Sequence, residues 1–171
     1  MAARVLVAVA VVATAATAAA YVSIIRSQGE QGTPDVLTVP FVAGYQLLMA
    51  LLLLASLVVP AAARPAFRGA ASAGLLVLGW LAAMSIGIPL LLAAGVAIGS
   101  TVLAIDSRPG LRSLISAGVA GMLAVALLAA GFEFTWNHLV CPPTGESGGS
   151  TASFLGHGSS YDCNNGVLTT R

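Results

Sequence analysis

The sequence contains no lysine and very few charged residues of any kind. Seven arginines and six acidic residues make up 8% of its 171 residues, and 58% of the residues are apolar. An average soluble chain is about 25% charged, so this small charged set cannot cover the surface of a water-soluble domain. We therefore expect a membrane protein covered mainly by lipid. The net charge of +1 and the lack of a basic cluster also exclude the electrostatic attraction on which nucleic-acid binding depends.

Sequence motifs for catalysis are missing as well. The chain has no glycine-rich phosphate loop, no G-x-S-x-G, no H-E-x-x-H and no pair of carboxylates spaced for one helix face. The two histidines, His138 and His157, lie outside the long apolar stretches, which excludes a haem held between membrane helices. The sequence therefore predicts a protein that is not an enzyme and holds no cofactor.

Four long stretches without charge set the expected topology. They cover residues 5–25, 36–63, 69–105 and 113–132. A helix needs about 20 residues to cross the hydrocarbon core, whereas a straight helix through the third stretch would be roughly 55 Å long. This stretch should fold back at Gly87 and Pro89, because glycine permits unusual backbone angles and proline cannot continue a helix.

The expected fold class is an all-α integral membrane protein with five transmembrane helices in a bundle over residues 1–132. The expected spans are residues 5–25, 39–59, 70–86, 89–105 and 113–132. The third and fourth spans form a tight hairpin, while Pro60 and Pro65 end the second span. Residues 133–171 follow as a small polar tail.

Arginine positions indicate the orientation of the spans, because short arginine-rich loops stay on the cytoplasmic side. With five spans and a cytoplasmic N-terminus, five of the seven arginines are cytoplasmic: Arg4, Arg64, Arg68, Arg108 and Arg112. A single crossing by the third stretch would reduce this to four against three. We therefore expect an extracytoplasmic tail and a location in the plasma (inner) membrane. Arginine without lysine, together with abundant alanine, glycine and valine, indicates a bacterial source.

The first span has a second interpretation. Arg4, an apolar stretch and Ala18-Ala19-Ala20 resemble a secretory signal peptide with a small-residue cleavage site. The apolar stretch continues to Ile25, however, and this length favours a membrane helix. Cleavage within residues 1–20 would leave four spans without changing the side that the tail faces.

The only two cysteines, Cys141 and Cys163, both lie in the tail. On an oxidising outer face they are expected to form a disulfide, which would add roughly 3 kcal/mol of stability. The alternative is a structural zinc site made of His138, Cys141, His157 and Cys163, because two imidazoles and two thiolates are a common zinc ligand set. Oxidation would use both sulfur atoms, so we expect the disulfide and no metal.

Polar side chains within the expected spans are few, and none is charged. Glu133 comes closest, but it follows the last span and can reach water. A charged side chain inside the membrane often marks an ion or proton path, so the sequence lacks the usual signal of such a path. Tyr45 and Gln46 are the residues most able to line a small polar pocket, with hydrogen bonding inside the bundle as the alternative role.

Small residues recur four positions apart in several of the expected spans. The pairs are Ala13 with Thr17, Ala70 with Gly74, Gly95 with Gly99, and Ala117 with Gly121. Such spacing lets helix backbones approach closely. It predicts a tight bundle that packs against a membrane-protein partner or a second copy of the chain.

Two functional hypotheses follow from these patterns. The first is a non-catalytic accessory or interaction subunit of a membrane assembly. The second is a small-solute transporter or channel component that acts as an oligomer. In the second hypothesis Tyr45, Gln46 and the break at Gly87 and Pro89 would line a polar path, because non-helical backbone is tolerated at membrane depth where it lines a cavity.

Overall fold

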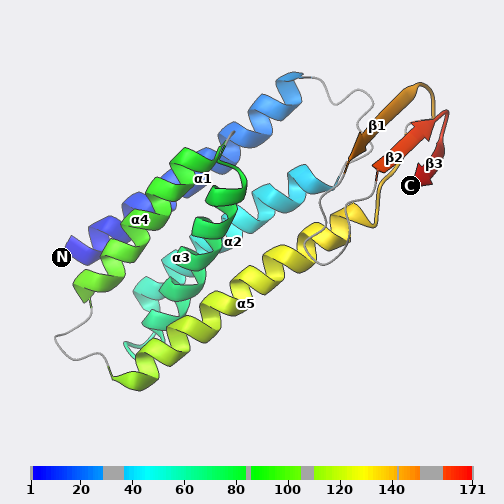
Figure 1. Cartoon of the computed structure of the whole chain (residues 1–171). Helices are drawn as coiled ribbons and strands as arrows, with labels where there is room; N and C mark the ends of the chain where they lie inside the picture. Colours follow the sequence, from blue (N-terminus) through cyan, green and yellow to red (C-terminus); the bar gives the residue numbers. More distant parts are fainter. Residues whose placement is uncertain are drawn as a thin grey trace.

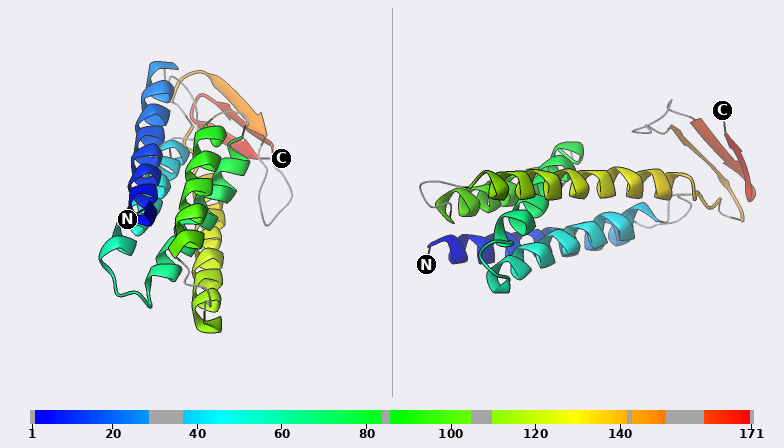
Figure 2. Two further views of the ribbon diagram at one scale, coloured as in Figure 1. Left: turned by 90° about the vertical axis from the view of Figure 1, so that its left-hand side faces the viewer. Right: turned by 90° about the horizontal axis from the view of Figure 1, so that it is seen from below.

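The computed structural model describes residues 2–28, 37–83, 86–104, 110–141, 143–150 and 160–170. It contains the helices α1 (Ala2–Gln28), α2 (Thr38–Val58), α3 (Arg64–Leu81), α4 (Gly87–Ala104) and α5 (Leu111–Trp136). The helices lie side by side in an elongated bundle, and a small β-sheet lies beyond one end of it (Figures 1 and 2). We call this end the sheet end. The opposite end, which holds Arg4, Arg64, Arg68 and Arg112, is the arginine end.

Three helices, α1, α2 and α5, are long and apolar enough to cross a membrane. In α4 the apolar part is shorter and covers Gly87–Val102, while α3 begins with two arginines within its first five residues. The structure therefore contains three helices with the length and apolar composition that a membrane span needs. Crossing of the membrane by α3 and α4 stays a prediction.

The third apolar stretch folds back, as expected from its length. Its first helix, α3, ends at Leu81 rather than at residue 86, and α4 begins at Gly87 with Pro89 in its first turn. The Gly87 N–H donates to the Ala82 carbonyl oxygen at 2.8 Å. A Cβ on Gly87 would collide with the Gly79 carbonyl oxygen, so this turn requires glycine. Pro89 is accommodated because the first turn of a helix needs no N–H donor.

The start of α3 corrects a second expected boundary. The preceding helix, α2, ends at Val58, just before Pro60, but Pro65 does not belong to the same stop signal. It lies in the first turn of α3, where proline is favourable. The helix therefore begins at Arg64 rather than at residue 70, and Arg68 lies within it instead of in a loop.

The described part of α5 runs from Leu111 to Trp136, longer at both ends than the span expected over residues 113–132. It packs mainly against α3, which also contacts α2 and α4, whereas α1 packs against α2 and α4. Its contact with α3 uses small residues: a Cβ added to Gly69 would lie 2.6 Å from the Ala117 carbonyl oxygen, and one added to Gly121 would lie 3.1 Å from Ala73 Cβ. The small pair Ala117 and Gly121 therefore forms a close helix contact, as its spacing predicts.

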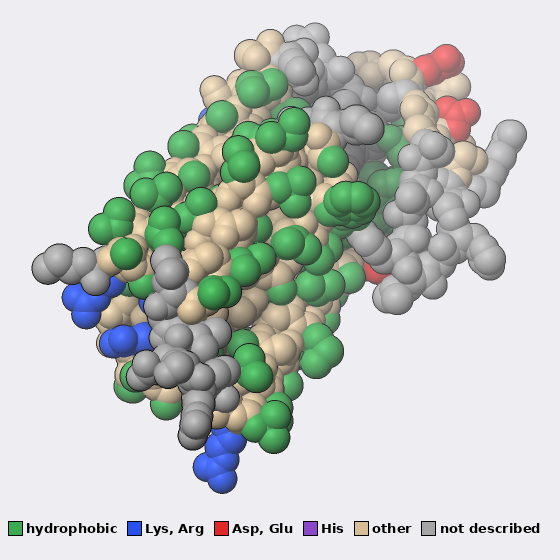
Figure 3. Space-filling view, turned by 60° about the vertical axis from the view of Figure 1, so that its left-hand side comes forward, with side chains coloured by type: hydrophobic (Ala, Val, Ile, Leu, Met, Phe, Trp, Pro, Cys, Tyr) green, Lys and Arg blue, Asp and Glu red, His purple; other side chains and the backbone are tan. Residues whose placement is uncertain are grey.

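Large apolar side chains cover the outside of the bundle, and the charged groups gather at its ends (Figure 3). Leu51, Leu92 and Met122 are among the many exposed apolar residues on α2, α4 and α5. Such a surface is typical of contact with lipid or with other membrane helices.

The tail contains a three-stranded antiparallel sheet, which corrects the expected all-α fold class. Its strands are β1 (Glu146–Ser150), β2 (Ser160–Asn164) and β3 (Val167–Thr170), in the order β1-β2-β3. Asn165 and Gly166 join β2 to β3 with positive φ angles of 46° and 85°, which suits the twist of a two-residue hairpin. The strands are rich in glycine, serine and threonine, so they lack the apolar alternation by which strands are usually recognised.

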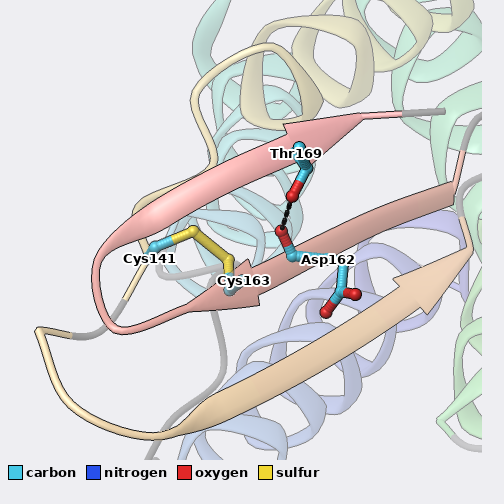
Figure 4. The surroundings of a disulfide bond; sticks show 4 residues. All are labelled: Cys141, Asp162, Cys163 and Thr169. Carbon is cyan, nitrogen blue, oxygen red and sulfur yellow. Dashed lines mark hydrogen bonds between the residues drawn. A yellow bond between two sulfur atoms is a disulfide. The ribbon is translucent and has the colours of Figure 1, made fainter.

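The expected disulfide between Cys141 and Cys163 is confirmed. Cys141 follows α5, and Cys163 lies fully buried on the central strand β2 (Figure 4). The bond therefore ties the central strand of the sheet to the segment that follows α5. On β3, the Thr169 hydroxyl donates to the Asp162 carbonyl oxygen at 3.2 Å and adds a side-chain hydrogen bond to the backbone pairing of β2 and β3.

Candidate functional site

A buried arginine links three helices at the arginine end. Arg68, in the second turn of α3, is only 5% exposed. Its Nε donates to the Ser56 hydroxyl of α2 at 3.3 Å, and its Nη1 donates to the Ser100 carbonyl oxygen of α4 at 3.1 Å. The Ser56 hydroxyl in turn donates to the Leu53 carbonyl oxygen at 2.6 Å. This connection was not predicted, because Arg68 was assigned to a loop.

Arg68 lies near the C-terminal ends of two other helices. Among the described residues no carboxylate forms an ion pair with it, but both of its acceptors lie in the last turns of α2 and α4. The C-terminal end of a helix carries partial negative charge because its last carbonyl groups have no partner within the helix. Arg64 adds to the same arrangement by donating from Nε to the Val59 carbonyl oxygen, just after α2, at 3.1 Å. This chemistry holds helices together and requires no transported ion.

Tyr45 connects α2 to α5. Its hydroxyl donates to the Ala124 carbonyl oxygen at 2.8 Å, and its ring lies 6.1 Å from the Phe41 ring. Gly74 of α3 provides the space for this side chain, because a Cβ there would lie 2.5 Å from the Tyr45 hydroxyl oxygen. The hydroxyl of Tyr45 is therefore engaged in packing between helices.

The side chain of Gln46 points in a different direction from that of Tyr45, because neighbouring residues of an α-helix are rotated by about 100° around its axis. It lies on the inward stripe of α2 that also contains Val42, Met49 and Leu53. Its side chain is completely buried, and neither Nε2 nor Oε1 has a hydrogen-bond partner. A buried polar group without a partner costs about 1–3 kcal/mol. The side-chain amide of Gln46 therefore has donors and an acceptor that are not used in hydrogen bonds.

A pocket of about 180 Å³ lies between α1, α2, α3 and α5 at the sheet end. Tyr21 and Thr38 contribute to its polar wall. Val42 and Leu78 are its most buried lining residues, at 5% and 1% exposure, so they form its floor. Neither Tyr45 nor Gln46, the two residues expected to be able to line a small polar pocket, is among the side chains that line it.

The residues of the possible zinc site do not form a metal centre among the described part of the chain. The two cysteine sulfur atoms are bonded to each other. The ring of His138 stacks on Phe134 with 4.2 Å between centroids, and its Nδ1 lies 2.8 Å from the Phe134 carbonyl oxygen. His157 lies outside the described residues. In the described ranges, no group of three or more histidine, cysteine or acidic side chains is arranged to hold a metal ion.

One glycine pair faces away from the bundle. A Cβ added to Gly95 or Gly99 on α4 would meet no atom within 4 Å, whereas Gly74 and Gly121 face other helices of the chain.

Models of protein families, curated proteins and solved structures give no match to this chain. The functional interpretation therefore depends on the side chains and surfaces described above.

Proposed function

We propose that this protein is a non-catalytic subunit of a membrane assembly and that the outer face of α4 packs against a transmembrane helix of a partner protein. The observation that carries the proposal is the outward position of Gly95 and Gly99. The opposite face of α4, with Leu90, Ala97 and Ser100, is buried against the rest of the bundle. A partner on the outer face would place α4 between two protein surfaces.

The shape of this outer face supports contact with a helix. Leu92, which is 68% exposed, and Val102, which is 62% exposed, project on either side of the two glycines along α4. Large side chains around a glycine notch allow two helix backbones to approach closely, and van der Waals contact is then the main source of affinity. The partner helix should therefore present small residues of its own at the crossing point.

The test is a double substitution, Gly95→Leu with Gly99→Leu, in the full chain purified from its native membrane. We expect the partner to be lost, because two leucines fill the notch, while the chain stays folded since both positions are open. Gly44→Leu is the matched control, because Gly44 on α2 also has no neighbour within 4 Å of an added Cβ. The readouts are the proteins that co-purify and the products of photo-cross-linking from position 92.

Two outcomes would contradict the proposal. One is an unchanged set of cross-linked proteins in the double variant. The other is a wild-type chain that gives no cross-linked product at all. A cross-linked product with twice the mass of the chain would show that the partner is a second copy of this chain, provided that the product is lost in the double variant.

We also infer five crossings in the inner membrane of a bacterium, with the arginine end in the cytoplasm. By their positions in the helices and strands, the arginine end gathers Arg4, Arg64, Arg68 and Arg112, whereas Arg26, Glu133, Glu146 and Asp162 belong to the sheet end. Figure 3 shows basic side chains at one end of the molecule and acidic ones toward the other. This distribution agrees with the retention of arginine-rich segments on the cytoplasmic side, and the disulfide agrees with an oxidising compartment for the sheet.

The inferred orientation predicts the activity of fused reporters. An alkaline phosphatase fused after Arg171 should be active, because this enzyme needs an oxidising compartment to form its own disulfides. The same enzyme fused in the segment between α2 and α3, at Ala62, should be inactive. An inactive fusion after Arg171, with normal protein levels, would place the tail in the cytoplasm and overturn the five-span orientation.

A transport function is supported by one observation, the unpaired amide of Gln46. On the same stripe of α2, however, Met49 and Leu53 are completely buried between Gln46 and Ser56. These two apolar side chains interrupt any polar path from Gln46 to the arginine end. The packing therefore favours the assembly subunit over the transporter.

A further inference from the structure

We propose that Asn165, in the turn between β2 and β3, is a modification site whose side-chain amide converts to a carboxylate once the Cys141–Cys163 bond opens. The folded sheet protects this residue, and the modified turn then hinders a return to the folded state. The reaction consumes water and needs no enzyme. This site is separate from the outer face of α4, so it does not depend on the assembly partner.

The residue after Asn165 makes the reaction possible. The sequence contains three asparagines, Asn137, Asn164 and Asn165, and only the last precedes a glycine. Because Gly166 has no Cβ, its backbone nitrogen attacks Asn165 Cγ with little steric hindrance. A bond forms between this nitrogen and Cγ, the Cγ–Nδ2 bond breaks, and ammonia leaves with the proton of the Gly166 N–H. Water then opens the cyclic imide at either carbonyl group and yields aspartate or isoaspartate.

Hydrogen bonds hold the Asn165 side chain in the folded tail. Its Oδ1 accepts from the Gly145 N–H at 3.2 Å, and its Nδ2 donates to Asn164 Oδ1 at 2.9 Å. The pair Asn164 and Val167 closes the turn on both sides. Attack brings Cγ to bonding distance of the Gly166 nitrogen, and this movement pulls the amide away from both partners. Two hydrogen bonds of typical strength should therefore slow the reaction by about tenfold or more.

The Cys141–Cys163 bond controls how readily the tail opens. Cys163 lies opposite Ser147 of β1 and Leu168 of β3, two residues before Asn165. All of β3 is exposed and β1 has no apolar side chain, and a small sheet without an apolar face is only marginally stable. A dithiol reduces the bond to two cysteine thiols and is itself oxidised to a disulfide. Loss of this link therefore opens the sheet and frees the Asn165 side chain.

Neither product restores the original turn. Aspartate keeps an acceptor for the Gly145 N–H but has no donor for Asn164 Oδ1. It also adds a negative charge to a network that already contains the Glu146 carboxylate, to which Asn164 Nδ2 donates at 3.2 Å. Isoaspartate lengthens the backbone of the turn by one carbon atom and disturbs the register of β2 with β3. The modification therefore marks chains whose tail has been open.

The test compares the purified full chain with and without dithiothreitol at mildly alkaline pH, which favours loss of the Gly166 amide proton. Mass spectrometry of proteolytic fragments gives the deamidated fraction at each asparagine, and labelling by an isoaspartyl methyltransferase detects isoaspartate. The reduced chain should deamidate at Asn165 at least about tenfold faster than the oxidised chain. Asn137 and Asn164 serve as internal controls and should stay intact, because no glycine follows them.

Three variants separate the opening of the sheet from an effect of the reductant. Cys141→Ser with Cys163→Ser should deamidate without dithiothreitol as fast as the reduced wild-type chain. In the oxidised chain, Asn164→Ala removes the acceptor of the Asn165 Nδ2 and should raise the rate about fivefold, whereas Asn137→Ala should leave it unchanged. Equal rates in the oxidised and reduced wild-type chain would overturn the proposal. A double cysteine variant as slow as the oxidised wild-type chain would overturn it as well.

Discussion

Replacing Arg68 with methionine should lower the free energy of unfolding by about 3 kcal/mol, because it removes hydrogen bonds from a charged group to two other helices. Methionine keeps most of the aliphatic volume of the side chain but offers no donor. The Ser56 hydroxyl and the Ser100 carbonyl oxygen then lose a charged partner, and the ends of α2 and α4 lose the cation between them. Unfolding of the purified chain in one detergent, followed by circular dichroism, gives the measurement.

Arg112→Met is the matched control for this prediction. Arg112 is exposed in the first turn of α5 at the same end of the bundle. Its replacement should change stability by less than about 0.5 kcal/mol, as for most surface substitutions. Equal destabilisation by the two variants would show that general charge at this end, rather than the three-helix connection, stabilises the bundle. Arg68→Lys should recover only part of the loss, because an ammonium group cannot reproduce the two directions of the guanidinium donors.

Replacing Gly69 with alanine should destabilise the bundle by about 2–3 kcal/mol, near the upper part of the range for overpacked interiors. The added Cβ would lie 2.6 Å from the Ala117 carbonyl oxygen and 2.9 Å from Ala117 Cα. These are backbone atoms of α5, so no side-chain rotation can relieve the contact. The two helices must move apart, and the small-residue contact between α3 and α5 is weakened along its length.

Gly118→Ala provides the control for Gly69→Ala. Gly118 is the next residue of α5 after Ala117, yet a Cβ added there meets nothing within 4 Å. Since alanine favours helix more than glycine by up to about 1 kcal/mol, this variant should be as stable as wild type or slightly more stable. If Gly69→Ala unfolded at the same temperature as Gly118→Ala, the close contact between α3 and α5 would be ruled out.

The hairpin of α3 and α4 could be predicted because membrane thickness limits the length of a straight helix. Gly87 and Pro89 then marked the place of the turn. The start of α3 could not be obtained in the same way, because Pro65 suits either the end of one helix or the first turn of the next. Only the packing of α3 against α2, α4 and α5 decides between these roles.

The candidate sites depend even more on tertiary contacts. Tyr45 and Gln46 are adjacent polar residues, and the sequence does not distinguish their roles. In the structure, α5 supplies a hydrogen-bond acceptor for the Tyr45 hydroxyl, whereas the Gln46 amide has no hydrogen-bond partner. The burial of Arg68 depends on a carbonyl group 32 residues away in sequence. The disulfide was predictable from the cysteine number and the expected oxidising compartment, whereas the sheet was not, because its strands are held by backbone pairing and the bond at Cys163 rather than by an apolar face.

The connection made by Arg68 has a consequence for how the ribosome and the insertion machinery deliver this chain. The Ser100 acceptor is synthesised 32 residues after Arg68, which takes roughly 2–6 s at typical rates of translation. If α3 entered the bilayer alone, its guanidinium would lack the carbonyl group that later receives it and would have to extend to the water at the membrane surface instead. Insertion of α3 and α4 together as one unit avoids this exposed intermediate, so biogenesis of this protein should proceed by pairs of helices at this step rather than helix by helix.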